Sequence, residues 1–515
     1  MKNFFTHSRA LKISLFATGL SGIVAEYVLA TMATYFLGDS VFQWTIILSL
    51  MLFSMGLGSR VCKRIKSNLL EKFILVELVI TLVTSFSALL IYTLMPFVSS
   101  IDIFIYGMSL VLGFLIGMEI PLVTRINEEY EELQSNISNV MENDYYGSLL
   151  GGLFFAFIGI RYLGLTYTPF VAGGVNLLVA ILVYLKFRNL IKENRKIKYY
   201  MFFTPVIFFA GLIFAKPIVV FGNQSRYNEK VVFTKQTPYQ QITITKWKEH
   251  HQLYLNQGKQ LSTFDEWMYH EPLIHPVMSL TKGPVEILLL GAGDGCAIRE
   301  LLKHERVKKI TLVDLDSSMT KIGKEHPIFR KMNEHSYHSN KVKVINEDAF
   351  NYIENNNIYY DIIIADFPDP KSIELNRLYT HEFYTLCYHR LRPKGAFITQ
   401  STSPYYTTKA FRCIEKTLNK VGFNTLPIHN HVYTFGEWSW VIGSKYLESN
   451  KMKSIIRSLN VNEENYKWLT KDALTLLTSF GKDLIPVDTS KIQVNSIHNP
   501  VLYKYYEHGN WSYNF

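Results

Sequence analysis

Long apolar runs in the first 220 residues constrain the fold of this 515-residue chain more than any other feature. A helix needs about 20 apolar residues to cross a bilayer. Six runs approach or exceed that length: 11–37, 41–59, 73–95, 101–122, 145–164 and 168–187. A seventh apolar segment covers 199–221. The first run is too long for a removable signal peptide and lacks a small-residue cleavage site. We therefore expect a multi-pass α-helical membrane domain over 1–221, in the cell (inner) membrane.

Lysine and arginine gather at alternate ends of these runs. Those ends carry Lys2, Arg9, Lys12, Arg60, Lys63, Arg64, Lys66, Lys186, Arg188, Lys192, Arg195, Lys196 and Lys198. The loops near 38–40 and 96–100 carry none, and Arg161 stands alone between the fifth and sixth runs. Because loops rich in Lys and Arg stay in the cytoplasm, we expect a cytoplasmic N-terminus.

The segment 199–221 decides on which side of the membrane the second half of the chain lies. Seven crossings would put that half outside the cytoplasm, whereas six would keep it inside. Pro205, Lys216 and Pro217 make this segment the weakest span. We therefore expect it to re-enter or lie in the interface, which leaves the second half in the cytoplasm.

Small residues and acids also occur inside the apolar runs. Glycines recur at spacings typical of helix packing: Gly56 and Gly58, Gly113 and Gly117, Gly151 and Gly152. Glu26, Glu77 and Glu119 are costly to place in a membrane and are functional candidates. They form either a path or sensor for a cation or hydrogen-bonded packing contacts, and both interpretations stay open.

Composition excludes several classes of function. The net charge of +10 arises largely from clusters beside apolar runs, and no nucleic-acid-binding motif is present, so nucleic acid is not an expected partner. The cysteines are Cys62, Cys296, Cys387 and Cys413. Without a CxxC pair they support neither a zinc site nor a disulfide framework, and we expect reduced thiols and no metal.

The pattern changes after the apolar half. Three short alternating segments, "VVFTKQ", "QQITITKW" and "HQLYLN", predict strands of a small β domain. A helix-like run, "DEWMYHEPLIHPVMSL", follows and is interrupted by Pro272 and Pro276. From 284 to 400, five apolar strands alternate with helices, which predicts a parallel, doubly wound sheet. We place the β domain with its helix at 222–280, the α/β domain at 281–445 and a C-terminal extension at 446–515.

The turn after the first of these five strands, "LLLGAGDGC", carries Asp294 inside a glycine loop. It matches G-x-G-x-G rather than the dinucleotide pattern G-x-G-x-x-G, so a dinucleotide is a weak interpretation. An acid at the end of the second strand, Asp314, suits a ribose diol but also suits a helix cap. Asp348, at a third strand end, suits the amino group of adenine or a turn.

Further acids follow the fourth strand and point to a cationic ligand. Asp366 and Asp369 occur in "DFPDP", and ligands of such sheets bind at the carboxyl ends of the strands. Asp294 would repel the carboxylate of S-adenosylmethionine but would hold the ammonium of its decarboxylated form. The acidic pair then suits a second, diamine substrate.

Seven segments of the second half carry a resemblance: "PYQQI", "DEWMYHEPLIHP", "GAGDG", "VDLD", "EDA", "DFPDP" and "TQSTSP". Together they resemble the polyamine aminopropyltransferases, the spermidine synthase family, over about 228–445. The resemblance implies a Rossmann-like domain of the class I S-adenosylmethionine-dependent transferase type. The segments "GLSGIVAEYVL", "ENDYYGSLLGG" and "VNSIHNPVLYKYYEHGNW" resemble a membrane-bound branch of that family.

The resemblance also implies roles for individual residues. Asp366 is implied as the proton acceptor, Asp369 as an amine ligand and Asp294 as the ligand of the aminopropyl amine. The other implied substrate contacts are Gln240 to the nucleoside, Tyr269 and His270 to substrate, Asp314 to the ribose, Asp348 and Ala349 to the adenine, and Gln400 in the cleft.

Three positions depart from the family pattern. Asp314 stands where the family usually has Glu, and Ile373 replaces a proline common after D-x-x-D-P. "VYTFGEW" replaces P-T-Y-P-x-G, which puts the role of Tyr433 and the identity of the acceptor amine in doubt.

The reaction that the resemblance implies transfers the aminopropyl group of decarboxylated S-adenosylmethionine, a co-substrate, to putrescine. Spermidine and methylthioadenosine are the products, and no cofactor is needed. Two alternatives remain: an amine N-methyltransferase that uses S-adenosylmethionine, and a non-catalytic membrane sensor or carrier of polyamines. The expected partners are the two substrates and the lipid bilayer, and the family suggests a homodimer.

Overall fold

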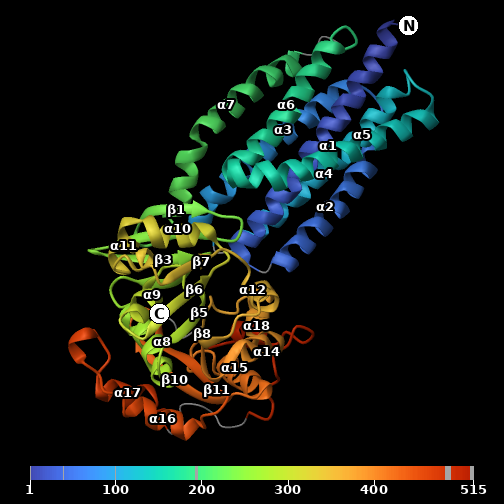
Figure 1. Cartoon of the computed structure of the whole chain (residues 1–515). Coiled ribbons are helices and arrows are strands. Elements are labelled where there is room, and N and C mark those ends of the chain that lie inside the picture. Colours follow the sequence, from blue (N-terminus) through green and yellow to red (C-terminus); the bar gives the residue numbers. More distant parts are fainter. Residues whose placement is uncertain (1, 39, 99, 192–194, 482–488, 511–515) are drawn as a thin grey trace. The chain divides into compact units, whose positions relative to one another are not determined.

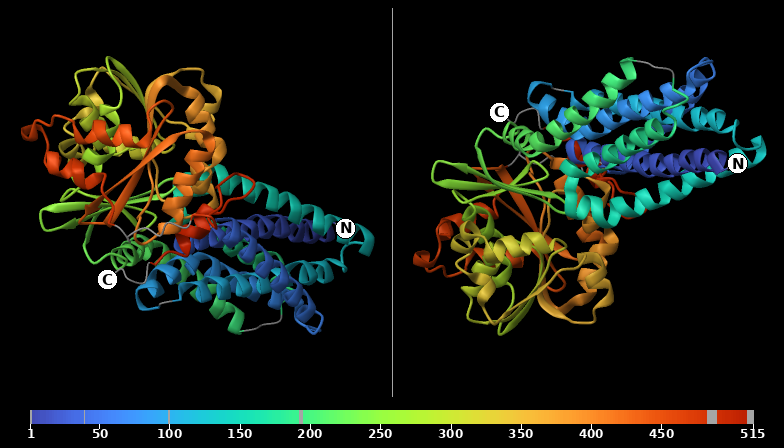
Figure 2. Two further views of the ribbon diagram at one scale, coloured as in Figure 1. Left: turned by 90° about the horizontal axis from the view of Figure 1, so that it is seen from below. Right: turned by 90° about the horizontal axis from the view of Figure 1, so that it is seen from above.

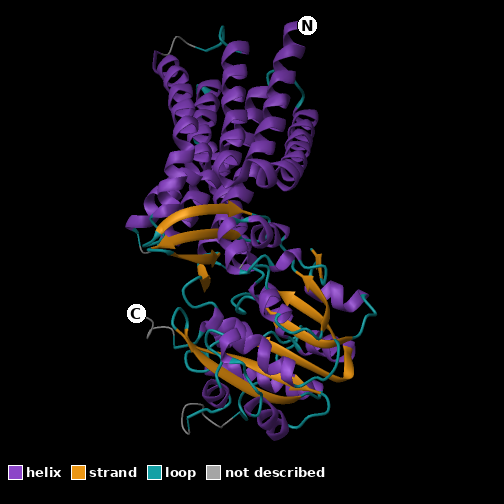
Figure 3. Cartoon of the chain, turned by 60° about the vertical axis from the view of Figure 1, so that its left-hand side comes forward, coloured by secondary structure: helices purple, strands orange, loops and turns teal. Residues whose placement is uncertain are grey.

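The computed structural model describes residues 2–38, 40–98, 100–191, 195–481 and 489–510. Lys192 and Trp511, which belong to segments discussed above, lie outside these ranges. The chain forms two compact units, Met1–Val231 and Val232–Phe515. The first is helical, and the strands begin with β1 (Lys230–Gln236) at the junction (Figure 3).

Long helices lie side by side in the first unit (Figure 1). Their bounds are α1 (Lys2–Leu37), α2 (Ser40–Cys62), α3 (Leu69–Leu94), α4 (Ile101–Asn127), α5 (Leu133–Phe154), α6 (Gly164–Lys186) and α7 (Arg195–Gln224), with a 3₁₀ turn η1 (Met95–Phe97) and a π-helical stretch η2 (Phe155–Leu163). In the described part of the chain, six helical stretches are long and apolar enough to cross a membrane. One of them, Leu133–Lys186, has 54 residues. At 1.5 Å per residue it would measure about 80 Å, far more than the hydrocarbon core of about 30 Å.

That long stretch folds back on itself where Gly164 adopts a φ of 64°. Gly147 of α5 packs on Phe16, and Gly151 packs on Leu20, so α5 runs in the same direction as α1. Ser21 bonds Asn176, whereas His7 contacts Lys186, so α6 runs against α1. The stretch therefore contains two antiparallel helices, as the separate runs 145–164 and 168–187 predicted.

The helix α7 is continuous over 30 residues, although Pro205 and Pro217 lie inside it. It runs alongside α3, with Gly211 against Phe86 and Gly222 against Tyr92. A continuous apolar helix of this length is long enough to cross a membrane, which favours a full span over the expected re-entrant or interfacial segment. The two prolines do not end the helix, because packing against α3 along its length supports it.

Glycines bring helix backbones into close contact inside this bundle. A Cβ on Gly117 would lie 2.1 Å from the carbonyl oxygen of Met55, and one on Gly113 would lie 2.7 Å from that of Met51. Gly58 and Gly151 pack equally closely on their neighbours. By contrast, Gly56 faces no atom within 4 Å. The glycine spacing thus predicted close helix packing, and the structure shows that the helices in contact are α2 with α4 and α1 with α5.

The acids inside the bundle differ in burial. Glu77 is fully buried and Glu119 is 3% exposed. The two side chains interact with each other, and Glu119 also interacts with Thr18 and Asp144. Glu26 is only partly buried. Glu77 and Glu119 thus belong to one polar layer formed by several helices.

The small β domain is a four-stranded meander of β1, β2 (Gln241–Trp247), β3 (His250–Leu255) and β4 (Gly258–Ser262). The sequence predicted three of these strands. The missed strand, β4, has only five residues and begins at a glycine. Its helix, α8 (Trp267–Ser279), is continuous through Pro272 and Pro276, contrary to expectation. Pro272 lacks the N–H that would bond Met268 O, and Asn430 Nδ2 donates to that carbonyl instead at 2.7 Å.

The second sheet has seven strands in the order β10-β11-β9-β8-β5-β6-β7. Their bounds are β5 (Val285–Gly291), β6 (Val307–Val313), β7 (Val342–Ile345), β8 (Tyr360–Asp366), β9 (Leu391–Gln400), β10 (Asn424–Val432) and β11 (Gly436–Ser444). The first five are parallel as predicted, but β10 and β11 are antiparallel, so the sheet is mixed. The antiparallel pair arises because a short turn at 433–435, within "VYTFGEW", joins two adjacent strands.

Helices flank this sheet, and Figure 2 shows the sheet and its helices in two further views. They are α9 (Cys296–Leu302), α10 (Ser317–Glu325), α11 (Pro327–Met332), α12 (Ala349–Asn355), α13 (Ile373–Asn376), α14 (His381–Arg390), α15 (Thr408–Val421), α16 (Ser449–Arg457), α17 (Lys471–Leu477) and α18 (Leu502–Glu507). Short 3₁₀ turns occur at Ser336–His338, Arg377–Tyr379 and Glu463–Asn465. The last three helices belong to the predicted extension 446–515, and they pack on the same core as the sheet.

Candidate active site

The glycine loop after β5 forms the floor of the candidate site. Gly291 has a φ of 79°, and a Cβ there would lie 2.1 Å from Asp366 O on the neighbouring strand β8. A Cβ on Gly293 would lie 2.7 Å from an Asp314 carboxylate oxygen. Tyr337 fixes the loop, because its hydroxyl donates a hydrogen bond to Gly293 O. Glycine is therefore required where this loop meets the two acids.

Asp294 lies in this loop beside His270. Its Oδ1 accepts a hydrogen bond from the backbone of Cys296 at 2.7 Å and lies 3.7 Å from His270 Nε2. The other ring nitrogen of His270, Nδ1, lies 2.9 Å from Glu266 Oε2. Burial opposes charge on the ring, but the hydrogen bond to Glu266 and the charge of Asp294 raise the pKa of His270 to about 9. His270 is therefore cationic at neutral pH.

Glu266 is a member of this site that was not singled out from the sequence. Arg299 donates to both of its oxygens, at 2.8 Å and 3.0 Å. Burial alone would raise the pKa of Glu266, but the bonds from His270 and Arg299 lower it to about 2. Glu266 is the second residue of the segment "DEWMYHEP", so the family resemblance of that segment could have pointed to it.

Glu266, His270 and Cys296 lie close enough to share a metal ion in the described part of the chain. Arg299 and His270 already bond the carboxylate of Glu266, and His270 Nδ1 is directed at it. Burial also raises the pKa of the Cys296 thiol well above its usual range, so the thiol stays protonated. These groups satisfy one another, which makes them poor metal ligands as they stand.

Asp366 ends β8 and faces α8. The Tyr269 hydroxyl donates to Asp366 Oδ1 at 2.5 Å. Burial raises the pKa of Asp366 to about 6, although the charge of His270 and the bond from Tyr269 oppose this rise. Burial also raises the pKa of Tyr269 well above its usual range, so it remains a donor. A carboxylate with this pKa is a competent proton acceptor near neutral pH.

Asp369 has a different set of partners from Asp366. Gln400 Nε2 lies 3.4 Å from its Oδ1, and the Tyr506 hydroxyl donates to its Oδ2 at 2.7 Å. Gln400 also donates to Tyr379 Oη at 2.5 Å. Burial raises the pKa of Asp369, against the nearby charge of Lys371 and the bonds from Tyr506 and Gln400. Tyr506 comes from the C-terminal extension and was not singled out in the sequence.

Asp314 and Gln240 lie at the end of β6 and in the β1–β2 turn, respectively. Burial raises the pKa of Asp314 to about 7, and its Oδ1 accepts from Asp316 N at 2.9 Å. The cap of α10 is Asp316 rather than Asp314, since Ser318 N bonds Asp316 Oδ1. Gln240 Nε2 and Thr237 Oγ1 both donate to Asp316 Oδ2. Asp316 was the second acid of "VDLD", and it joins the predicted nucleoside residue to this strand end.

Asp348 and Ala349 lie at the start of α12. Asp348 caps this helix by accepting from Asn351 N, and its Oδ1 lies 2.9 Å from an Arg377 nitrogen. Ala349 is 7% exposed. A contact with the adenine amino group and a purely local turn role both stay open for Asp348, because a capping carboxylate can still present its other oxygen to a ligand.

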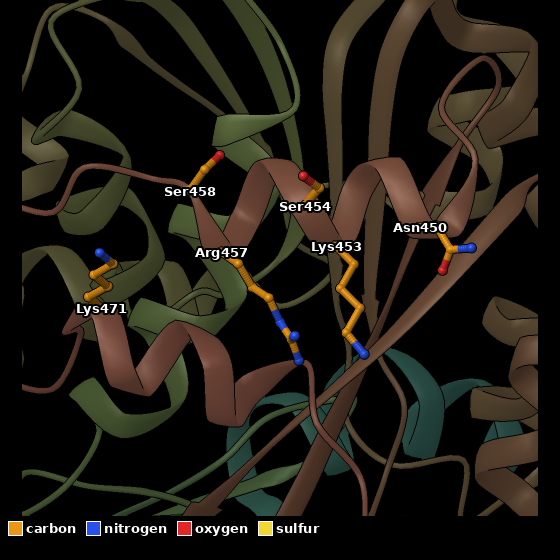
Figure 4. A pocket seen from close by; sticks show the side chains of 6 residues that line it. All are labelled: Asn450, Lys453, Ser454, Arg457, Ser458 and Lys471. Atoms are coloured by element: carbon orange, nitrogen blue, oxygen red, sulfur yellow. The ribbon is translucent and has the colours of Figure 1, made fainter.

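Two further features of this unit are a turn tyrosine and a groove. Tyr433 is in the β10–β11 turn and is 64% exposed. A groove of about 580 Å³ is lined by Asn450, Lys453, Ser454, Arg457, Ser458 and Lys471 (Figure 4). It contains three basic residues and no acid, so it does not suit a cationic substrate. The candidate site is therefore the group formed by Tyr269, His270, Asp294, Asp366 and Asp369, which we call the acidic site.

Comparisons with known proteins identify relatives of this chain. Residues 266–455 match the family model described as the spermine/spermidine synthase domain. Polyamine aminopropyltransferase 2 of Aquifex aeolicus (strain VF5) is 39% identical over 503 residues, which cover 97% of this chain and 98% of that protein. The polyamine aminopropyltransferase of Leptospira interrogans is 34% identical over 505 residues, with the same coverage of 97% and 98%.

A solved structure is also similar. The spermidine synthase from Thermotoga maritima is 25% identical, with a TM-score of 0.44, and the match covers 49% of this chain and 85% of that one.

Proposed function

The chain belongs to the spermine/spermidine synthase family, and we propose that its acidic site performs the aminopropyl transfer of that family. It is a polyamine aminopropyltransferase that moves the aminopropyl group of decarboxylated S-adenosylmethionine to putrescine. The products are spermidine and methylthioadenosine. The observation that carries the assignment of the chemistry is the pairing of Asp366 with Tyr269 beside His270 and Asp294.

Asp294 selects the donor in this proposal. Its carboxylate would attract the ammonium that ends decarboxylated S-adenosylmethionine and repel the carboxylate of S-adenosylmethionine. Asp314, at the end of β6, is proposed for the ribose diol, and Gln240, bonded to Asp316, is proposed for the nucleoside. Asp348 and Ala349 are proposed for the adenine. This order follows the carboxyl ends of β5, β6 and β7, where ligands of such sheets bind.

The proposed step is a direct displacement. The lone pair of a neutral primary amine of putrescine forms a C–N bond to the aminopropyl carbon. The bond from that carbon to the sulfonium breaks, and its electrons stay on sulfur, which leaves as neutral methylthioadenosine. Asp366 accepts the proton that the new ammonium loses. The raised pKa of Asp366, about 6, makes this transfer less unfavourable than for an exposed aspartate.

Two alternatives fit the residues less well. An amine N-methyltransferase would place the carboxylate of S-adenosylmethionine near Asp294, where like charges repel. A non-catalytic sensor would not need a buried proton acceptor with a tyrosine bonded to it at 2.5 Å. No metal or cofactor enters the proposed step, and a homodimer remains a prediction.

We further propose that the helical unit is embedded in a membrane and that all seven helices cross it. Near the start of α1, His7 contacts Lys186 and Phe187, so α1 begins at the end of the bundle where basic residues gather. Past the end of α7, Arg226 donates to Tyr35, near the other end of α1. The chain therefore leaves the bundle at the end opposite to the N-terminus.

Sidedness then follows from the charges. The positive-inside rule puts the basic end in the cytoplasm. From a cytoplasmic start, six crossings would leave the catalytic half in the cytoplasm. In this proposal α7 is a seventh crossing, which reverses the side. We therefore propose that the catalytic unit follows α7 on the side of the membrane away from the cytoplasm.

The experiment that tests the activity is release of methylthioadenosine by the purified full-length protein. Decarboxylated S-adenosylmethionine and putrescine should give methylthioadenosine and spermidine in equal amounts. S-adenosylmethionine with the same amine is the control, and methylated amine from that mixture would support the methyltransferase instead. Binding of both substrates without any product would support the sensor.

A further inference from the structure

The C-terminal segment 495–506 contacts the acidic site, although it lies outside the matched region 266–455. Its α18 presents Tyr506, which is 7% exposed and donates to Asp369 Oδ2 at 2.7 Å. Burial and the charge of Asp369 raise the pKa of Tyr506 well above its usual range, so the hydroxyl keeps its proton. Asp369 therefore has a donor on each side, Gln400 from β9 and Tyr506 from the extension.

Asn495 fixes this segment to the loop beyond β8. It is fully buried, and its Nδ2 donates to Tyr379 O at 3.0 Å and to Asn376 O at 3.3 Å. Its Oδ1 accepts from Val501 N and Leu502 N at the start of α18. Since Tyr379 also donates to Pro368 O, the segment and the "DFPDP" loop share one hydrogen-bonded frame. A buried frame of this kind holds Tyr506 in a fixed position.

The two acids of "DFPDP" divide between two surroundings. Asp366 is bonded to Tyr269 and interacts with His270 and with Asp294, the acid that the proposed function assigns to the donor. Asp369 is bonded to Gln400 and Tyr506, and Lys371 Nζ lies 5.9 Å from the centroid of the Tyr506 ring. A diamine has two amino groups: one attacks as the neutral amine, and the other stays a charged ammonium. Asp369 is thus the acid available for the ammonium that does not react.

We propose that the C-terminal segment forms part of the acceptor subsite, in which Tyr506 positions the Asp369 carboxylate for the distal ammonium of a diamine. This inference rests on the proposed function and adds to it a residue that selects the acceptor. At the departure "VYTFGEW", Tyr433 is 64% exposed in a turn, whereas Tyr506 is bonded to Asp369.

The test compares Tyr506→Phe with Tyr503→Phe, a control in the same helix whose ring faces Lys504. Each variant is assayed as the full-length protein with putrescine and with butylamine, a monoamine of the same length. We expect Tyr506→Phe to raise KM for putrescine about tenfold, as for loss of one hydrogen bond to a charged group. KM for butylamine and for the donor should stay within about twofold, since neither uses Asp369, and Tyr503→Phe should change none of them.

Three outcomes bear on the inference. An unchanged KM for putrescine in Tyr506→Phe would overturn it, and so would equal losses for putrescine and butylamine, which indicate a merely structural role. If the wild-type protein releases no methylthioadenosine, the proposed function itself fails. In that case calorimetric binding of putrescine still decides the subsite, because Tyr506→Phe should weaken it about tenfold and Tyr503→Phe should not.

Discussion

The hydroxyl of Tyr269 donates to Oδ1 of Asp366 at 2.5 Å, which joins a helix next to the small β domain to the end of a central strand. Pro272 and Pro276 lie in that helix, and the carbonyl freed by Pro272 is satisfied by Asn430 of β10. The local structure therefore places one face of α8 over the strand ends. Substitution of either partner of this contact, Asp366 or Tyr269, therefore tests the proton acceptor.

Asp366→Asn should abolish turnover while nucleoside binding survives. Asparagine keeps the shape and can still accept from Tyr269, but it cannot take a proton, so we expect a loss of about 10²–10⁴-fold in kcat. The measurements are methylthioadenosine release and methylthioadenosine affinity. Asp361→Asn, at the other end of β8, is the matched control, because Asp361 bonds Arg392 at the start of the neighbouring strand β9. Near-normal turnover in Asp366→Asn would reject the assignment.

Activity should depend on pH through Asp366. Its pKa is about 6, so kcat/KM should fall as the pH drops below that value and the carboxylate becomes protonated. The bond from Tyr269 stabilises the charged form and lowers this pKa. Tyr269→Phe should therefore move the acid limb of the profile to higher pH, beyond any loss in rate. A pH–rate profile of both proteins measures this, and an unshifted limb would show that Asp366 is not the group that titrates.

Asp294→Asn should change donor selection rather than loop structure. The amide oxygen can still accept from Cys296 N, but the charge that faces the donor's ammonium is lost. We expect decarboxylated S-adenosylmethionine to bind about ten- to a hundredfold more weakly, with methylthioadenosine much less affected. Calorimetry with both ligands checks this. Equal losses would mean that the acid only shapes the loop.

Gly117→Ala should destabilise the helical unit, whereas Gly107→Ala in the same helix should not. A Cβ at Gly117 would lie 2.1 Å from Met55 O, but one at Gly107 meets nothing within 4 Å. Separating two packed backbones costs about 1–3 kcal/mol. Thermal unfolding of the protein in detergent measures the effect. Equal melting temperatures for the two variants would contradict the close α2–α4 contact.

The seventh crossing predicts the side on which a reporter becomes active. An alkaline phosphatase fused after Gly222 should be active, because this enzyme works only outside the cytoplasm. The same reporter fused after Lys66, at the basic end, should be inactive. An inactive fusion after Gly222, together with the inactive control at Lys66, would return the catalytic unit to the cytoplasm and restore an even number of crossings.

The sequence predicted local structure well where one physical constraint acts over a short range. The lengths of the apolar runs predicted the long helices. The alternation of apolar and polar residues predicted three strands of the meander, and the alternation of apolar strands with helices predicted the five parallel strands. It also placed Asp294, Asp314 and Asp366 at strand ends. It made 199–221 the weakest span because of its prolines, whereas α7 is a continuous helix packed against α3. It did not predict β10 and β11, whose antiparallel pairing depends on a hairpin rather than on strand composition.

The amino-acid sequence alone indicates the chemical groups: acids in a glycine loop and beyond a strand, a Tyr-His pair and apolar spans. Which of these groups meet depends on the folded chain. Asp316 rather than Asp314 caps α10, and it accepts a hydrogen bond from Gln240. Arg299 donates to Glu266. Tyr506 donates to Asp369, although the two residues are 137 positions apart in the chain. Contacts between such distant segments leave no local pattern, because they depend on packing of the folded core rather than on neighbouring residues.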